Sequence, residues 1–309
     1  MSKSILITGA SGFLGKHLVN LLDKDYELLL PSSSVMDVTN YEDVCDILTR
    51  YRPEFVIHLA AQCGGIGANQ VNPAYYFHSN NLMGLNIMNA CHELGISKLI
   101  TLGSVCSYPK FTPVPFKEED LWNGYPEETN APYGIAKRNL ITGCKAYSDQ
   151  YGCNFIHLIP VNMYGEYDNF DLESSHVIPA LIRKMHTAKA QGLDEVVIWG
   201  DGSASREFLY AGDCARAIKL ALEGYNSPDP INIGTGMEIT IRDLVEKVKS
   251  IVGFSGQIVF DTSKPNGQPR RCLDTSKAKE KFGFEAQICF EEGLQKTYNW
   301  YLENISQDE

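Results

Sequence analysis

The sequence predicts an α/β protein: a doubly wound parallel sheet of the Rossmann type with a smaller C-terminal substrate-binding lobe. Three observations predict this fold. Short apolar runs of β character alternate with helical segments through the first half of the chain, a glycine-rich turn follows the first run, and long loops replace the alternation from about residue 163. Strand–helix alternation favours parallel strands joined by right-handed crossovers.

The elements of the first half are expected in strict alternation. Strands are predicted at 4–8, 26–30, 54–60, 98–104 and 155–161, and helices at 13–22, 41–51, 74–94 and from Tyr133 onward. In the second half, helices are expected near 177–190, 241–252 and 290–303, and strands near 195–200, 231–234 and 257–260. We expect residues 1–162, with a return segment at about 207–234, to form the dinucleotide-binding domain, and residues 163–309 to form the substrate lobe.

Composition narrows the class of protein. The chain has 309 residues and a formal net charge of −11, which disfavours nucleic acid as a partner because phosphate backbones call for a basic surface. No apolar run has the length of a membrane span, and no signal peptide is apparent, so we expect a cytoplasmic protein without a membrane partner. The nine cysteines are irregularly spaced, without a C-x-x-C motif, so we expect neither a disulfide framework nor a metal site.

A glycine-rich turn predicts where a dinucleotide binds. The segment "TGASGFLG" places Gly9, Gly12 and Gly15 three residues apart, between a predicted strand and a predicted helix. Gly9 allows a tight turn, Gly12 lets the backbone approach a pyrophosphate, and Gly15 allows close helix–strand packing, while the helix N-terminus faces the anion. A glycine motif alone is weak evidence, but this strand–turn–helix context makes it specific.

The choice between the two nicotinamide dinucleotides depends on the end of the second strand. An acidic residue there would bind the ribose hydroxyl of NAD(H), and the sequence has "LLLPSSS" instead, with neither an acid nor an arginine. Ser32, Ser33 and Ser34 can bond a 2′-phosphate, helped by Lys16, and Asp37 is expected at the adenine. We therefore favour NADP(H) over NAD(H).

Ser104, Tyr133 and Lys137 predict a reductase site. Asn130 suits a helix N-cap and Pro132 the first turn, so Tyr133 and Lys137 lie one turn apart on one helix face. Tyr133 can deliver a proton to a carbonyl that accepts hydride, and a nearby ammonium is expected to lower its pKa of about 10. A Tyr and a Lys four apart are usually only a helix face. The glycine turn and the Ser104 hydroxyl favour the catalytic interpretation.

Cys106, two residues after Ser104, is not needed for hydride transfer. Ser104, Cys106 and Asn162 follow predicted strand ends, where ligands of such sheets bind. A thiol beside the carbonyl-binding hydroxyls suggests proton abstraction from carbon, and so a two-step enzyme acting on a keto sugar. A single Cys after a strand is more often packing, and a single His such as His176 is more often exposed, with Ser174 or Ser175 capping the next helix.

These motifs together resemble the extended short-chain dehydrogenases/reductases and, within them, the GDP-sugar epimerase/reductases. General features are "TGASGFLG", "HLAA", Tyr133-x-x-x-Lys137 and "PVNMYG". More specific are "GSVCSYPK", "DNFDLESSHVIPALIRK", "VVIWGDGSASREFLY" and "FDTSKPNGQPRRCLD". The resemblance covers almost the whole chain. It implies C3/C5 epimerisation and NADPH-dependent C4 reduction of GDP-4-keto-6-deoxy-D-mannose to GDP-L-fucose, in a homodimer.

The resemblance implies a role for each matching position. By this resemblance, Cys106 is the epimerisation base and His176 the acid. Removing a proton beside the ketone gives an enolate, which Ser104 and Tyr133 would stabilise. The residues implied in cofactor binding are Thr8, Gly9, Ser11, Gly12, Phe13, Leu14, Gly15, Ser33, Asp37, Leu59, Ala60, Ala61, Lys137, Pro160, Asn162 and His176. Those implied in substrate binding are Ser104, Cys106, Tyr133, Asn162, Lys184, Trp199, Arg206, Asn266 and Arg270.

Two departures keep alternatives open. Asn266 stands where the family often has Asp, and "PSSS" lacks the basic residue often found near the 2′-phosphate. Similar patterns also occur in enzymes acting on other GDP-linked keto sugars, including 6-deoxyheptoses. The alternatives are such a relative, a C4 reductase or epimerase alone, and a non-catalytic dinucleotide-binding sensor, against which the retained Tyr133 and Lys137 argue.

Overall fold

The computed structural model describes residues 3–172, 174–264, 266 and 268–305. Its centre is a six-stranded, fully parallel sheet in the order β2-β1-β3-β4-β5-β9. The strands are β1 (Ser4–Thr8), β2 (Glu27–Leu29), β3 (Phe55–His58), β4 (Lys98–Leu102), β5 (Phe155–Pro160) and β9 (Ile231–Ile233). This confirms the doubly wound fold predicted from the strand–helix alternation.

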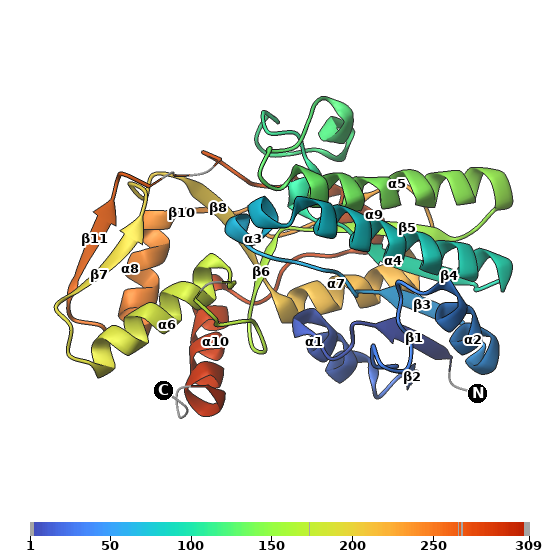
Figure 1. Cartoon of the computed structure of the whole chain (residues 1–309), viewed down its shortest axis with the longest axis horizontal. Coiled ribbons are helices and arrows are strands. Elements are labelled where there is room, and N and C mark those ends of the chain that lie inside the picture. Colours follow the sequence, from blue (N-terminus) through green and yellow to red (C-terminus); the bar gives the residue numbers. More distant parts are fainter. Residues whose placement is uncertain (1–2, 173, 265, 267, 306–309) are drawn as a thin grey trace.

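Helices cover both faces of the parallel sheet (Figure 1). On one face α1 (Phe13–Leu22) packs beside α7 (Ala211–Gly224), and on the other α2 (Tyr41–Tyr51), α4 (Pro73–Glu93) and α5 (Ala131–Tyr151) pack side by side. Alternate residues of β1 supply both layers: Ile5 and Ile7 lie in the core under α1 and α7, and Leu6 in the core under α2 and α4. This alternation follows from the two-residue period of a strand.

A smaller lobe follows β5 and carries its own core (Figure 1). It contains the three-stranded sheet β10-β8-β6, in which β6 (Asn162–Tyr164) and β10 (Glu238–Thr240) flank β8 (Ser205–Tyr210). A parallel pair joins β7 (Glu195–Trp199) to β11 (Gln257–Asp261). The packed helices are α6 (Val177–Ala190), α8 (Ile241–Val252) and α10 (Phe290–Asn304).

The chain returns to the large lobe more than once. β9 completes the parallel sheet and α7 packs on α1, whereas β8, the start of the expected return segment, belongs to the small-lobe sheet. A further short helix, α9 (Ser276–Phe282), contributes Ala278 to the large-lobe core, and Phe284 just after it does the same. Sequence patterns did not predict this last return. A helix of seven residues has too few apolar positions to show which of the two cores it packs against.

Short elements at the carboxyl edge of the sheet were also not predicted. These are α3 (Ile66–Val71) and the 3₁₀ helices η1 (Val105–Ser107) and η2 (Glu118–Trp122). Within the described residues, no helix combines the length and apolar character that crossing a bilayer requires.

Candidate active site

The glycine turn after β1 has the geometry that a pyrophosphate needs. Gly9 has a positive φ of 70° and lies against the backbone of Ala60, so a side chain there would meet both strain and a collision. A methyl group at Gly15 would collide with the carbonyl oxygen of Gly9, and one at Gly12 would come within 3.2 Å of the same oxygen. Gly12 is also the N-cap of α1, and no side chain caps it. The free N–H groups of this helix end therefore suit an anionic group.

The neighbouring strand end closes the turn from the side. The Thr8 hydroxyl accepts a hydrogen bond of 3.2 Å from the Ala60 N–H and lies 2.8 Å from Nδ1 of His58. Leu59 N–H donates to the Thr8 carbonyl. The segment 59–61 is thus held against the glycine turn by β1 and β3.

The end of β2 presents three exposed serines. The Ser32 and Ser34 hydroxyls bond each other at 2.8 Å, and Ser33 lies between them. Asp37 is exposed, and its carboxylate accepts hydrogen bonds from the backbone and the side chain of Thr39, which lower its pKa. Asp37 therefore closes a local turn of the loop beside these serines.

Ser104, Tyr133 and Lys137 meet at the carboxyl edge of the sheet. Ser104 follows β4 as the N-cap of η1, where its hydroxyl accepts a hydrogen bond of 3.2 Å from the Cys106 N–H. This hydroxyl also lies near enough to the Tyr133 phenol to act on its pKa. Lys137 lies one turn further along α5 with only 4% of its surface exposed, and its Nζ is 5.8 Å from the centre of the Tyr133 ring.

Two contacts fix α5 against the turn that carries Cys106. Gly134 packs so closely on the Cys106 carbonyl oxygen that a methyl group would collide with it. Arg138 is buried, and its Nε donates to the Ser107 carbonyl and its Nη1 to the Gly124 carbonyl, each at 3.0 Å. The register of Tyr133 against Ser104 and Cys106 is therefore set by backbone contacts on either side.

The pKa of Tyr133 differs from the sequence-based expectation. The side chain is partly exposed, yet the protein atoms around the phenol raise its pKa well above the usual value, and the thiols Cys63 and Cys106 act in the same direction. Burial also lowers the pKa of Lys137. The expectation that the Lys137 ammonium dominates was wrong, because desolvation disfavours the charged form of both groups. Tyr133 is therefore a neutral phenol in the free protein.

Cys106 faces two arginines from the small lobe. Nη1 of Arg271 donates to Sγ of Cys106 at 3.8 Å. Arg206, on β8, is close enough to both for their charges to act on it, and its pKa is lowered to about 10, first by burial and then by Arg271. Sequence reasoning singled out Arg206 and Arg270 and missed Arg271. The two guanidinium groups thus place positive charge beside the thiol.

The segment 269–274 reaches Cys106 because both lobes hold it by hydrogen bonds. On the small-lobe side, Ser205 N–H donates to the Pro269 carbonyl and Leu273 N–H to the buried carboxylate of Glu207, at 2.9 and 2.7 Å. On the large-lobe side, Phe116 N–H donates to the Cys272 carbonyl at 2.8 Å. Arg271 thus bridges the lobes beside the thiol.

Arg270 points to a different neighbour. Its guanidinium forms an ion pair with Glu238, on β10. Adjacent residues of an extended segment project to opposite sides, so Arg270 and Arg271 cannot both face Cys106.

The remaining predicted substrate residues lie on the small lobe and its loops. His176 is the N-cap of α6, exposed at the surface, and desolvation by its surroundings lowers its pKa. Lys184 lies two turns further along α6. Trp199 ends β7 with 65% of its surface exposed, and Nζ of Lys264 lies 5.5 Å from the centre of a Trp199 ring. Oδ1 of Asn266 accepts a hydrogen bond of 2.8 Å from the Asp201 N–H, so this side chain holds the loop after β7.

Asn162 and Pro160 lie where β5 passes into the small lobe. Asn162 begins β6 opposite Phe208, and Pro160 ends β5 opposite Ile233. Cys63, which the sequence analysis did not single out, is exposed, with Sγ 3.4 Å from the Tyr133 hydroxyl. No periodicity in the irregular loop after β3 could have indicated that contact.

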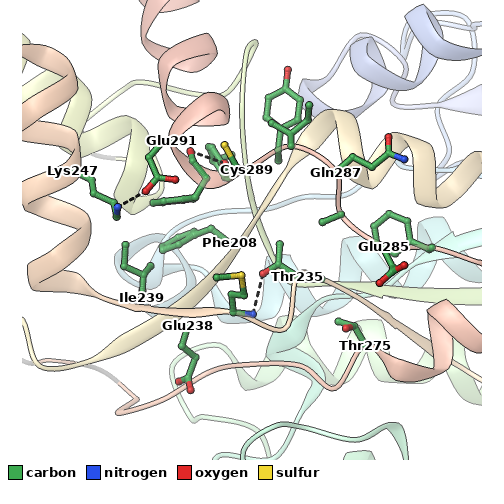
Figure 2. Close-up of a pocket in the computed structure, with 18 of the residues that line it drawn as sticks. Phe208, Thr235, Glu238, Ile239, Lys247, Thr275, Glu285, Gln287, Cys289 and Glu291 are labelled. Carbon is green, nitrogen blue, oxygen red and sulfur yellow. Dashed lines mark hydrogen bonds and ion pairs between the residues drawn. The ribbon is translucent and has the colours of Figure 1, made fainter.

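A large cavity of about 930 Å³ lies elsewhere, between α8, α10 and β10 (Figure 2). Phe208 and Ile239 line it, together with the ion pair of Lys247 and Glu291. Ser104, Cys106, Tyr133 and Lys137 are not among the described residues that line it. This cavity is therefore separate from the candidate active site.

The fold and site define a class of dinucleotide-dependent enzymes of the extended short-chain type. The chain belongs to the NAD dependent epimerase/dehydratase family, whose model matches residues 5–234.

Particular relatives share nearly the full length of the chain. It is 42% identical over 308 residues to the putative GDP-L-fucose synthase 2 of Arabidopsis thaliana, covering 99% of this chain and 94% of that protein. Among solved structures, a GDP-6-OMe-4-keto-L-xylo-heptose reductase from C. jejuni has a TM-score of 0.92 at 31% identity, covering 98% of each chain. A GDP-L-fucose synthetase from Naegleria fowleri bound to NADP has a TM-score of 0.90 at 31% identity, covering 98% of this chain and 95% of that one. The resemblance inferred from the sequence motifs is therefore confirmed.

Proposed function

We propose that this protein converts GDP-4-keto-6-deoxy-D-mannose to GDP-L-fucose by C3/C5 epimerisation followed by NADPH-dependent reduction at C4. The observation that carries the proposal is the meeting of Ser104, Cys106 and Tyr133 at one turn, over a buried Lys137. A reductase needs the two hydroxyls and the lysine. The thiol, flanked by Arg271, adds what an epimerase needs. Relatives named for this reaction and the NADP-bound neighbour support both the substrate and the cofactor.

The residues divide the two reactions between them. Ser104 and Tyr133 donate hydrogen bonds to O4, which stabilises the enolate of epimerisation and the alkoxide of reduction alike. Cys106 removes the proton from the carbon beside the ketone, and Arg271 donates a hydrogen bond to its sulfur. His176 returns a proton to the other face. Its pKa is low in the free protein, and the negative charge of the enolate favours the imidazolium that does this.

The reduction step uses the same hydroxyls. NADPH supplies the hydride that C4 accepts. Tyr133, a neutral phenol, gives its proton to O4, and the Lys137 ammonium stabilises the tyrosinate that remains. We assign NADP(H) binding to residues 1–162 with the return segment at 207–234, with the serines after β2 as partners for the 2′-phosphate. Residues 163–309 are assigned to the GDP-sugar, with Lys184, Trp199 and Arg206 as its contacts and Arg271 in place of Arg270.

The direct test is the identity of the product. The protein is incubated with NADPH and GDP-4-keto-6-deoxy-D-mannose, and the product is analysed by NMR. GDP-L-fucose supports the proposal, and GDP-rhamnose, the product of reduction without epimerisation, contradicts it.

A second candidate, a GDP-keto-heptose reductase, is favoured by the likeness to the C. jejuni heptose reductase. Deuterated water separates epimerase from reductase chemistry, because only an epimerase labels C3 and C5. Cys106→Ser should then stop labelling while NADPH binding, followed by fluorescence, stays unchanged. His176→Asn is the matched variant, because it keeps the base and removes the acid. With a substrate that carries deuterium at C3 or C5, loss of the deuterium should be faster than inversion of that carbon. Labelling of the Cys106→Ser variant at the normal rate would remove Cys106 from the mechanism.

We also propose a cytoplasmic homodimer. All nine cysteines are free thiols, which suits a reducing compartment. α4 and α5 lie side by side on one face, and α4 exposes Phe77 by 43% and Leu85 by 50% (Figure 1). Pairing these helices with a second copy would cover such side chains. Sedimentation of the wild type and of Leu85→Glu tests this: a dimer that becomes a monomer supports it, and a wild-type monomer overturns it.

A further inference from the structure

Gln268 links a loop of the large lobe to the arginine that faces Cys106. Its Nε2 donates a hydrogen bond of 2.8 Å to the carbonyl of Lys110, in the loop that follows η1. Its Oε1 accepts a hydrogen bond of 2.6 Å from Nε of Arg271. The Gln268 side chain is half-buried, and the proposed chemistry gives it no role.

The two partners fix the direction of the Gln268 amide. The Lys110 carbonyl can only accept a hydrogen bond, and Nε of Arg271 can only donate one. The amide must therefore turn its NH₂ group to Lys110 and its oxygen to Arg271. In the opposite orientation, two acceptors would face each other at one end and two donors at the other. Each end of this side chain thus has one partner that fits it.

These hydrogen bonds close a ring that begins and ends on the loop of Cys106. Nη1 of Arg271 donates to Sγ of Cys106 at 3.8 Å, while Gln268 holds Nε of the same guanidinium. Gln268 is in turn anchored to Lys110, four positions after Cys106. Because a guanidinium is planar and rigid, bonds at Nε and Nη1 together set its orientation as well as its position.

The backbone on both sides of this ring is fixed independently. Lys110 N–H donates to the Tyr125 carbonyl at 2.9 Å, which holds the large-lobe loop. Phe116 N–H donates to the Cys272 carbonyl at 2.8 Å, directly after Arg271. These bonds leave the long Arg271 side chain free to change rotamer, and ordering such a side chain costs conformational entropy. The glutamine amide supplies the bond that selects one rotamer.

We propose that Gln268 is a positioning residue for epimerisation, which holds the Arg271 guanidinium against the thiol of Cys106. The proposal rests on the epimerase function proposed above. Within the described residues, the Arg271 side chain bonds this amide and the thiol, and neither partner is a carboxylate. The amide therefore orients the guanidinium and leaves its charge uncancelled, whereas Glu238 pairs with the charge of Arg270.

The test compares Gln268→Met with the wild type in deuterated water. Methionine has a similar volume and forms neither bond, so exchange at C3 and C5 under saturating substrate should slow about threefold to fivefold. The internal control is the oxidation of GDP-L-fucose by NADP⁺. That reaction moves a hydride from C4 to NADP⁺ and releases the proton of the C4 hydroxyl through Tyr133 to solvent. It does not use Cys106, so its rate in Gln268→Met should equal that of the wild type.

A double-mutant cycle separates positioning from a general loosening of the loop. In Arg271→Ala there is no guanidinium to orient, so adding Gln268→Met should slow exchange no further. Thr112→Val is the matched control, because the Thr112 hydroxyl donates to the Pro109 carbonyl at 2.8 Å in the same loop but forms no bond of the ring. It should leave exchange unchanged. Unslowed exchange in Gln268→Met, equal slowing in Thr112→Val, or undiminished slowing in the Arg271→Ala background overturns the proposal.

A second measurement needs neither turnover nor a variant. A crystal structure of the wild type with the Gln268 amide between Lys110 and Arg271 supports the inference, and a Gln268 side chain turned to solvent overturns it. Failure of the function and failure of the inference are distinguishable. If the wild type exchanges no proton at C3 or C5, the proposed function fails and this role fails with it. If the wild type and Gln268→Met exchange equally fast, only the role of Gln268 fails.

Discussion

The two walls of the candidate active site are built in different ways. The large-lobe wall consists of strand ends and one long helix: Lys137 is almost fully buried, and Gly134 and Arg138 fix α5 against the turn of Cys106. The small-lobe wall consists of loops and exposed side chains, such as Trp199, and of segment 269–274, which is held by backbone hydrogen bonds from both lobes. The rigid wall therefore carries the groups whose placement decides the chemistry, and the loop wall carries those that choose and hold the sugar.

The difference in burial also divides the electrostatics. On the large-lobe wall desolvation dominates, raising the pKa of Tyr133 and lowering that of Lys137. On the loop wall the charges act on one another: after burial, Arg271 is the main influence on Arg206. A substitution on the large-lobe wall should lower the rate of hydride transfer. A substitution on the loop wall should affect epimerisation and substrate binding more than hydride transfer.

The largest expected effect breaks the rigid wall at its proton donor. Tyr133→Phe removes the phenolic proton while keeping the ring, so kcat for NADPH oxidation with GDP-4-keto-6-deoxymannose should fall by about 10²–10⁴-fold. The assay is the loss of NADPH absorbance under saturating substrate. Tyr151→Phe, at the exposed end of the same helix, is the control and should keep wild-type kcat. A Tyr133→Phe variant with more than a tenth of wild-type kcat would contradict the assignment.

The next effect lies on the loop wall. Arg271→Ala removes the cation that donates a hydrogen bond to Sγ of Cys106. Proton removal by the thiol loses that support, so deuterium exchange at C3 and C5 should slow about tenfold. Arg271→Lys keeps a charge but lacks the planar guanidinium. Its exchange rate should lie between those of the wild type and Arg271→Ala. Exchange is followed by NMR in deuterated water.

Arg270→Ala is the matched control for that series. Its guanidinium is paired with Glu238, so it should lose a surface ion pair and slow the exchange less than Arg271→Ala. Equal exchange rates in the two alanine variants would mean that Arg271 does not assist proton removal by Cys106.

The same contrast explains how much the sequence could predict. The large-lobe site follows from local signals: a glycine turn after a strand, a hydroxyl and a thiol at the next strand end, and Tyr133 and Lys137 one helical turn apart. Each depends on residues close in sequence or on parallel strands that end at one edge. Those elements appear in the structure at nearly the predicted bounds.

The loop wall depends on contacts between distant residues. Arg271 faces Cys106 because Phe116 and Glu207 hold residues 272 and 273, more than sixty positions away in the chain. Arg270 and Arg271 are chemically identical, so only the orientation of the extended segment decides which one faces the thiol. The Tyr133 pKa was misjudged for a similar reason: the lysine is visible in the sequence, but the desolvation around it is not.

A smaller effect concerns the cofactor end of the rigid wall. Ser33→Glu places a carboxylate among the exposed serines after β2, where it would repel a 2′-phosphate. KM for NADPH should rise about tenfold or more, while KM for NADH should change little. Ser34→Ala, which loses one hydroxyl without adding charge, should raise KM for NADPH by only about twofold to threefold. An unchanged preference in Ser33→Glu would place the phosphate elsewhere.

The smallest effect is on stability, in the loop between β6 and α6. One oxygen of Asp168 accepts the Asn169 N–H, and the other is buried without a partner among the described residues. Desolvation raises the pKa of this carboxyl to about 7. Because the folded pKa lies above the unfolded one, the protein loses stability as pH rises from about 4 through 7. Asp168→Asn removes that loss. It should raise the free energy of unfolding by about 1–2 kcal/mol at pH 8, allowing for the partly exposed side chain, and by less at pH 5. Urea denaturation at both pH values measures it, and an equal gain at the two would show that the amide acts through packing and not through charge.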